Sequence, residues 1–204
     1  MKKFLIVSLV ILFAAAVLPQ SAAAGVGVKV GYAWSNLKFA GSTDVPILTD
    51  IKNPVGGVYF SMGLGLFSIQ PEILYVRQGA RMEALPDWME DRVDYIQVPV
   101  LLKIHVIPGP ISPMVYAGPY GAYLVSAKGV SFVDGVTESV DIKDQIKSTD
   151  YGVVFGGGID FRLPVIKLSA EVRYNLGLAN VAKNPDPGMS VKTKSLMVLV
   201  GIGF

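Results

Sequence analysis

The stretch IKLSAEVRYNLGL, residues 166–178, alternates apolar and polar side chains over its whole length. Its even-numbered positions carry isoleucine, leucine, alanine, valine and tyrosine, whereas its odd-numbered positions carry lysine, serine, glutamate, arginine, asparagine and glycine. A helix would mix these two sets around its circumference, but a strand places them on opposite faces. The stretch therefore predicts a long β-strand with one apolar face and one charged face.

Seven further segments after residue 24 show the same period of two. The alternation is least clear in 54–66, 69–81 and 113–127, whose face assignment stays open. The eight predicted strands are 25–34, 54–66, 69–81, 92–106, 113–127, 149–162, 166–180 and 192–204. Strands of soluble sheets have mostly about 5–6 residues, whereas a tilted strand needs about 9–11 residues to cross a bilayer. The lengths of these segments favour a membrane-spanning sheet.

The connections between the predicted strands alternate between long and short. The long, polar connections are 35–53, 82–91, 128–148 and 181–191, and the short ones are 67–68, 107–112 and 163–165. An outer-membrane barrel with both termini in the periplasm has long loops outside and tight turns inside. The order of the connections therefore predicts an all-β protein, an eight-stranded antiparallel up-and-down transmembrane β-barrel.

Aromatic residues follow the same division between the two ends. Those near the long connections are Tyr32, Trp34, Tyr123, Tyr151 and Tyr174, and those near the short ones are Phe67, Phe161 and Phe204. Aromatic belts are typical of the two interfaces between a membrane and water. The pattern indicates that the apolar faces point outward, into lipid.

The charged faces must then point into the lumen. Eight strands enclose a lumen about wide enough for side chains to fill. The charged residues on these faces are Lys29, Glu72, Lys103, Asp160, Arg162, Lys167, Glu171 and Arg173. Unpaired charge is costly in such a site, so we expect these groups to form a hydrogen-bonded network that plugs the barrel.

The first 24 residues predict a cleavable signal peptide. Lys2 and Lys3 precede an apolar run, and the alanines at 22–24 suit cleavage between Ala24 and Gly25. A retained anchor is the alternative, but the run is short for a membrane span of about 20 residues. Removal leaves one domain, 25–204, with 16 basic and 16 acidic residues. This neutral balance argues against nucleic acid as a partner.

The composition excludes several kinds of chemistry. The chain has no cysteine, so disulfides, thiolate metal sites and cysteine nucleophiles are unavailable. His105 is the single histidine, which excludes a multi-histidine zinc site. We therefore expect no cofactor and no metal site.

Three stretches resemble the signature segments of a known family. They are QPEILYVRQGA at 70–80, YIQVPVLLK at 95–103 and YAGPYGAYLVSA at 116–127. In this order they resemble the PorT-type outer-membrane β-barrel proteins, small exported barrels of the Bacteroidetes and related bacteria, over essentially all of 25–204. The resemblance implies an eight-stranded barrel in the outer membrane. It leaves the activity open, because most members of the family are uncharacterised. The named member belongs to a protein-secretion apparatus. It also implies that Phe204, Ile202 and Val200 form the signal read by the barrel-insertion machinery.

Each local candidate site has a simpler interpretation. His105 is a candidate catalytic base, but no nucleophile stands at a suitable spacing, so a satisfied interior histidine is the better interpretation. The glycine-rich segment 155–160 lies within a strand and precedes no helix, so it predicts packing space rather than a phosphate loop. Asp87, Glu90 and Asp91 predict an ordinary solvated loop rather than a calcium site, because EF-hand spacing is absent.

Three classes of function remain. The first, which we favour, is a non-enzymatic barrel with a structural or interaction role in the cell envelope. Its expected partners are outer-membrane lipid and possible envelope or secretion proteins. The second is an outer-membrane enzyme acting on lipid A or phospholipid. The third is a soluble lipocalin-like binder, which the outward aliphatic band argues against.

Overall fold

The computed structural model describes residues 23–40, 48–84, 87–133, 136–183 and 190–204. The strands are β1 (Ala23–Ala40), β2 (Leu48–Leu64), β3 (Phe67–Ala84), β4 (Asp87–His105), β5 (Ile111–Val133), β6 (Val136–Asp141), β7 (Thr149–Arg162), β8 (Lys167–Gly177) and β9 (Ser190–Gly203). A single 3-10 turn, η1 (Lys143–Gln145), follows β6. Among the described residues, no helix is long and apolar enough to cross a membrane. Residues 1–22 of the predicted signal peptide lie outside the described residues.

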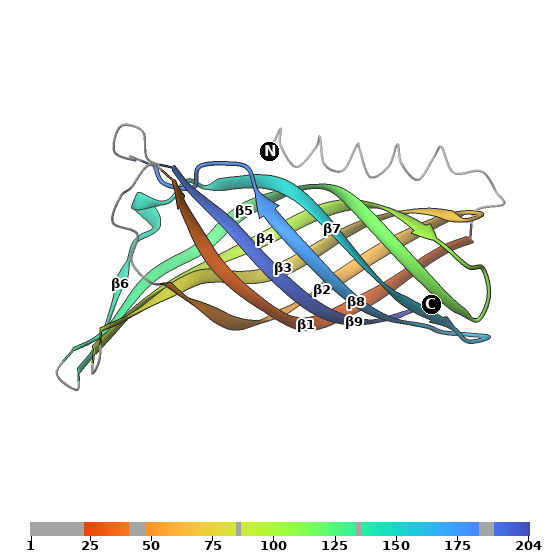
Figure 1. Ribbon diagram of the computed structural model, residues 1–204, viewed down its shortest axis with the longest axis horizontal. Coiled ribbons are helices and arrows are strands. Elements are labelled where there is room, and N and C mark those ends of the chain that lie inside the picture. Colours follow the sequence, from red (N-terminus) through yellow and green to blue (C-terminus); the bar gives the residue numbers. More distant parts are fainter. Residues whose placement is uncertain (1–22, 41–47, 85–86, 134–135, 184–189) are drawn as a thin grey trace.

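Eight of the strands close into one barrel (Figure 1). Their order is β4-β3-β2-β1-β9-β8-β7-β5, and β4 pairs with β5 to complete the circle. All of these pairings are antiparallel, so the predicted eight-stranded antiparallel barrel is confirmed. The two ends of the described chain meet where β1 and β9 start and finish: the Val26 amide donates to the Phe204 carbonyl at 3.2 Å, and the Phe204 amide donates to the Val26 carbonyl at 2.8 Å.

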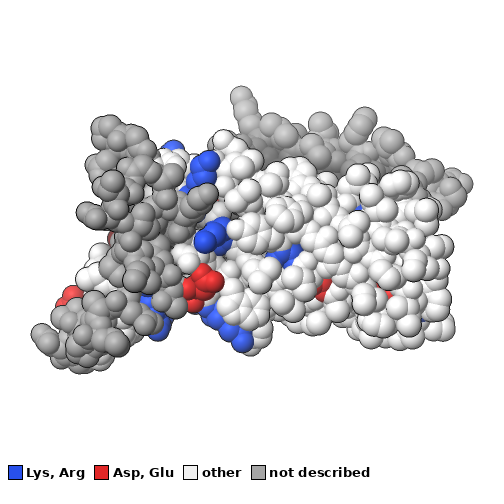
Figure 2. Space-filling view, in the orientation of Figure 1, with Lys and Arg blue, Asp and Glu red and all other residues white. Residues whose placement is uncertain are grey.

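The barrel is apolar outside and polar inside. Val28 is 49% exposed on the outer face of β1, whereas the neighbouring Lys29 is 1% exposed on the inner face. The structure also settles the open face assignments, since Tyr59, Glu72 and Tyr116 point inward from β2, β3 and β5. Figure 2 shows that charged side chains gather toward the end with the long connections, whereas the rest of the visible wall is almost uncharged.

The strands extend further than the sequence predicts at the end with the long connections. β3 and β4 stay paired from Gly79 opposite Arg92 to Ala84 opposite Asp87, although 82–91 was expected to be a loop. The sequence of 82–91, MEALPDWMED, does not alternate apolar and polar residues, so it carries no signal with a period of two. The first short turn also lies at Gly65 and Leu66 rather than at 67–68, and Gly65 adopts the positive φ of 65° that favours glycine.

The third long connection, 128–148, contains a ninth strand that the sequence analysis missed. β5 pairs with β7 as far as Tyr123 and then changes partner, because its last six residues, from Lys128 on, pair with β6. All six residues of β6 are exposed, so no buried face marks it in the sequence. β5 and β6 form a hairpin that projects beyond the barrel (Figure 1).

The core of the protein is the interior of the barrel. An apolar layer fills the lumen between its charged groups and the end with the long connections. It consists of Ala33, Val55, Leu74, Val76, Met197 and Leu199. At the end with the long connections, Ile142 and Ile146 flank η1 and pack against Val93, Tyr95 and Leu124. The η1 segment therefore covers this mouth of the barrel.

Candidate functional site

Five charged side chains from four strands meet inside the barrel. Lys29 on β1 donates to Glu72 on β3 and to Glu171 on β8, both at 2.7 Å. Lys103 on β4 donates to the same Glu171 oxygen at 2.7 Å. Since β4 and β8 are not neighbours in the barrel, these ion pairs cross the lumen rather than follow one strand pair. We call this group, completed by Arg173, the central network.

Arg173 joins the two carboxylates of the central network. Its guanidinium donates to Glu72 at 2.7 and 3.1 Å and to Glu171 at 2.8 Å, and the side chain is fully buried. Gln70 adds a bond from its side-chain amide to Glu72 at 2.6 Å. A two-pronged guanidinium contact is the strongest and most directional form of ion pair. The network is therefore held in one geometry.

Two tyrosines that the sequence analysis did not single out enclose the cations. The Tyr116 ring lies 5.0 Å from the Lys103 ammonium, and the Tyr59 ring lies 5.1 Å from that of Lys29, distances typical of cation–π contacts. Tyr59 fits only because β1 and β9 carry glycines beside it: a Cβ at Gly27 would lie 2.4 Å from its ring, and one at Gly203 would lie 2.3 Å from its hydroxyl. The sequence does not settle which faces of β2 and β5 point inward, so neither ring could be assigned to the lumen from the sequence.

A second group lies nearer the short turns. His105 Nε2 lies 3.1 Å from Asp160 Oδ2, and the Lys167 ammonium lies 3.8 Å from the same oxygen. Arg162 was predicted to belong to the lumen charges, but it is exposed at the end of β7 and makes no ion pair with the described residues. The eight predicted lumen residues thus divide into five in the central network, two beside His105, and Arg162 outside both.

The lumen has a cavity at each end and packed side chains between them. A cavity of about 420 Å³ opens at the short turns, where Tyr59, His105 and Lys167 line it. A smaller one of about 180 Å³ lies under η1, lined by Tyr95 and Ile146 among others. The central network and the apolar layer lie between the two cavities. In the described part of the chain, packed side chains therefore fill the lumen between the two cavities.

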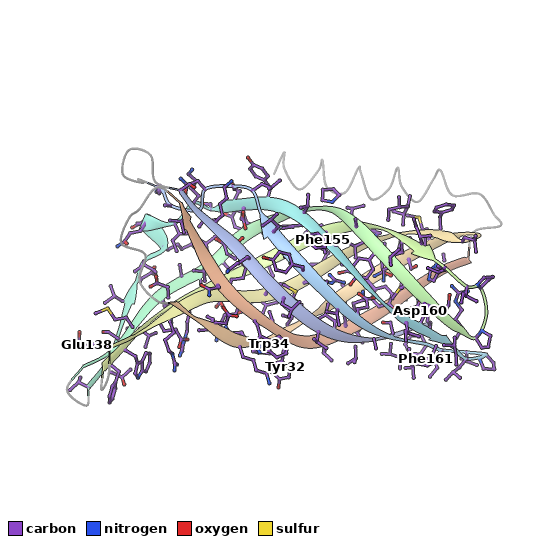
Figure 3. All side chains as sticks on the ribbon, viewed as in Figure 1. Tyr32, Trp34, Glu138, Phe155, Asp160 and Phe161 are labelled. Carbon is purple, nitrogen blue, oxygen red and sulfur yellow. The ribbon has the colours of Figure 1, made fainter. Side chains whose placement is uncertain are left out.

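The other predicted positions lie on the barrel wall. Ala24 and Gly25, the predicted cleavage site, pair with Met62 and Ser61 at the start of β1. Phe204, Ile202 and Val200 lie along the outward face at the end of the chain, and Phe204 is 67% exposed. Figure 3 shows Tyr32 and Trp34 pointing away from the wall, while Phe161 lies at the opposite, short-turn end.

Glu90, one of the acidic residues of the second long connection, is paired with two arginines. Glu90 accepts hydrogen bonds from Arg81 and Arg92. Burial opposes ionisation of Glu90, but these two guanidinium groups outweigh it and hold the pKa of Glu90 below its ordinary value. No group of three metal-ligating side chains occurs in the described part of the chain, and the side chain of Asp87 lies outside it.

The projecting sheet is built from β3, β4, β5 and β6. Trp88 on β4 stacks on Phe132 on β5 with ring centroids 6.0 Å apart, and the Arg81 guanidinium lies 4.6 Å from the Trp88 ring. At its base, Arg77 pairs with Asp94 at 2.6 Å. β6 is the last strand of this sheet, and no described strand pairs with its outer edge.

A closed barrel with an aliphatic outer wall, aromatic belts and a charged interior is a membrane-spanning β-barrel, because closure leaves no open strand edge in lipid. The chain belongs to the outer membrane protein beta-barrel domain family, whose model matches residues 19–183. The protein is therefore an outer-membrane β-barrel whose wall contacts membrane lipid.

Solved structures share this fold. OprG from Pseudomonas aeruginosa matches with a TM-score of 0.54 and 13% identity, over 90% of this chain and 97% of that one. Neisserial surface protein A matches with a TM-score of 0.50 and 13% identity, over 91% of this chain and 100% of that one. At this identity the similarity shows the fold alone. No curated protein matches the sequence.

Proposed function

We propose that this protein is a non-enzymatic docking barrel, which holds a projecting β-sheet outside the cell and binds a partner protein at the free edge of β6. The observation that carries the proposal is β6 itself. An exposed strand edge presents unpaired N–H and C=O groups, and an extended segment of another protein pairs readily with such groups. Val136 and Val140 are 59% and 62% exposed and offer apolar contacts beside the edge.

The interior supports a structural rather than a catalytic role for the lumen. His105 directs Nε2 to Asp160, and among the described residues no hydroxyl bonds its Nδ1. A nucleophile activated by a base would need such a contact. Lipid-A mass spectrometry of cells with and without the protein separates this proposal from the enzyme alternative, since a docking barrel leaves the lipid unchanged.

Site-specific photo-crosslinking in cells tests the docking edge. A crosslinker in place of Glu138 on β6 should capture one discrete partner, and a crosslinker at Val165, in the exposed turn at the opposite end, serves as the control. Adding Val140→Pro should abolish the product, because proline removes a backbone donor and distorts the edge. Equal products from both positions, or a product that survives Val140→Pro, would refute docking at β6.

We also propose that the barrel is a PorT-type protein and an accessory of a secretion system, exported by cleavage between Ala24 and Gly25. The three stretches at 70–80, 95–103 and 116–127 support the assignment to the PorT type, and the apolar leader supports export with cleavage. N-terminal sequencing of the membrane protein should begin at Gly25. Loss of a secreted cargo in a deletion strain would support the secretion role, and unchanged secretion would contradict it.

A further inference from the structure

Three lysines lie on the outer wall on either side of β1: Lys52 on β2, and Lys192 and Lys194 on β9. Lys52 is opposite Trp34 in the pairing of β1 with β2, and Lys194 is opposite Asn36 in the pairing of β1 with β9. All three are on the outward face, because the neighbouring residues Ile51 on β2 and Thr193 on β9 are buried and point inward. In the part of the chain that the structure describes, none of them makes an ion pair. We call these residues the lysine sector.

The lysine sector lies at the level of the lipid headgroups. The Lys52 ammonium lies 4.4 Å from the Tyr32 ring and 5.5 Å from the Trp34 ring, which belong to the aromatic belt (Figure 3). Toward the short turns, the same wall becomes aliphatic, with Val30 and Leu196 exposed. Aromatic belts mark the interface, and the long connections mark its outer side. The lysines therefore face the outer leaflet where headgroup phosphates lie.

Four other cations at this end already have partners. Arg77 pairs with Asp94, Arg81 and Arg92 pair with Glu90, and the Lys143 ammonium donates to the Val125 carbonyl at 2.9 Å. In the lysine sector, the nearby carboxylate is that of Asp50, which accepts a hydrogen bond from the Asn36 side chain at 2.5 Å. Among the described residues, none of the three lysines pairs with a carboxylate, so the sector presents unpaired positive charge on an outward-facing surface.

The spacing of the lysines suits a ligand that carries two anionic groups. Lys52 and Lys194 are separated by β1, which is two interstrand spacings or roughly 10 Å of wall. Two phosphate groups at about this separation would each meet a lysine on its own side of β1, with no side chain reaching across the strand. We propose that the lysine sector binds an outer-leaflet lipid with two phosphate groups about 10 Å apart, one against Lys52 and one against Lys192 and Lys194. The acyl chains then lie on the aliphatic wall below.

Lipid titrations of the purified full-length barrel in neutral detergent test this proposal. The probes are bisphosphorylated lipid A, monophosphorylated lipid A and inorganic phosphate, and the signal is Trp34 fluorescence in a Trp88→Phe background. Bisphosphorylated lipid A should bind about fivefold more tightly than the monophosphorylated form, the factor expected for one lysine at an anionic surface. Inorganic phosphate should not compete at equal concentration, because it lacks the chains that contact the wall.

Substitutions of single charged residues then test which lysines bind the lipid. Lys52→Gln and Lys194→Gln should each weaken binding of the bisphosphorylated lipid about fivefold and reduce its preference over the monophosphorylated form. Asp50→Asn should tighten binding, and Lys147→Gln, an exposed lysine on the third connection, should leave it unchanged. Unaltered migration of unboiled samples on a detergent gel shows that each variant folds.

Three results would overturn the proposal. Equal affinity for the two forms of lipid A would exclude a two-phosphate site. Wild-type binding by Lys52→Gln or Lys194→Gln would exclude the lysine sector. Equally tight binding of inorganic phosphate would identify a free-anion site instead of a lipid site.

Discussion

Glu171 accepts hydrogen bonds from three cations that come from β1, β4 and β8. Its removal leaves Lys29, Lys103 and Arg173 with Glu72 as their remaining carboxylate in the central network, inside a lumen that excludes water. Glu171→Ala should therefore destabilise the barrel by about 3–5 kcal/mol, the cost of stranding a buried charge.

The matched control for this variant is Glu138→Ala, an exposed acid on β6. Its free energy of unfolding should change by no more than about 0.5 kcal/mol, as for most surface substitutions. Urea unfolding of both variants in the same detergent measures the difference. Equal losses in the two variants would show that the central network contributes nothing special to stability.

Individual lumen residues were predictable wherever a strand alternates cleanly. Lys29, Lys103 and Glu171 follow from the parity of their strands, since each neighbour is an outward aliphatic residue. Parity does not say where a strand leaves the lumen, which is why Arg162 was assigned to the interior although it is exposed at the end of β7. The pairing of particular cations with particular carboxylates depends on barrel closure and register, which no single strand encodes.

At the scale of single elements, the β3–β4 hairpin depends on Glu90. Because the folded pKa of Glu90 lies below its ordinary value, its stabilising effect is complete above about pH 4.3 and is lost as the pH falls through the folded pKa. The tip of the hairpin should loosen in acid while the barrel stays closed. Trp88 fluorescence in a Trp34→Phe background, followed from pH 7 to pH 3, reports this change, because Arg81 lies on the Trp88 ring.

The control for the acid transition is Glu90→Gln, which cannot ionise. Its hairpin should be weaker at pH 7, by about 1 kcal/mol or less for pairs this exposed, and its Trp88 signal should be independent of acid. A transition of wild-type size in Glu90→Gln would show that another group controls the hairpin.

The end of β9 combines a small structural role with a proposed assembly role. Deleting Phe204 removes two backbone hydrogen bonds to Val26 and a side chain that is mostly exposed. We expect the deletion to reduce outer-membrane yield in cells more than the stability of refolded barrel, and Phe204→Tyr to retain much of both, because an aromatic ring remains at the interface. Normal cellular yield of the deletion, or equally severe losses in both assays, would contradict this.

The strands that face lipid on one side and the lumen on the other could be predicted from the sequence, whereas the projecting sheet could not. Residues 149–162 and 192–204 show a period of two because one face of each strand meets lipid and the other meets the lumen. All six residues of β6 are exposed, and the outer parts of β3 and β4 lie beyond the barrel (Figure 1), so the sequence there carries no strict constraint with a period of two. The same difference explains why β6 was missed and why β3 and β4 exceed their predicted ends.

At the scale of the whole molecule, closure of the sheet makes the fold resistant to detergent. Every barrel strand that the structure describes is paired on both edges, so the barrel presents no open strand edge to lipid. Unboiled and boiled samples should migrate differently on a detergent gel. Identical migration, together with a helical circular dichroism spectrum, would contradict the barrel.

The filled lumen also predicts that the protein does not conduct ions as a porin does. Three successive barriers occupy the lumen: the central network, the apolar layer around Leu74 and Met197, and the η1 segment with Ile142 and Ile146. Eight strands leave about enough room for side chains alone, so bulk water is excluded between the two terminal cavities. Planar-bilayer recordings of reconstituted protein should therefore show no large, long-lived conductance steps. Because the barriers act in series, Ile142→Ser with Ile146→Ser should loosen the mouth without opening a pore, and stable porin-sized steps from this double variant would show that η1 alone closes the lumen.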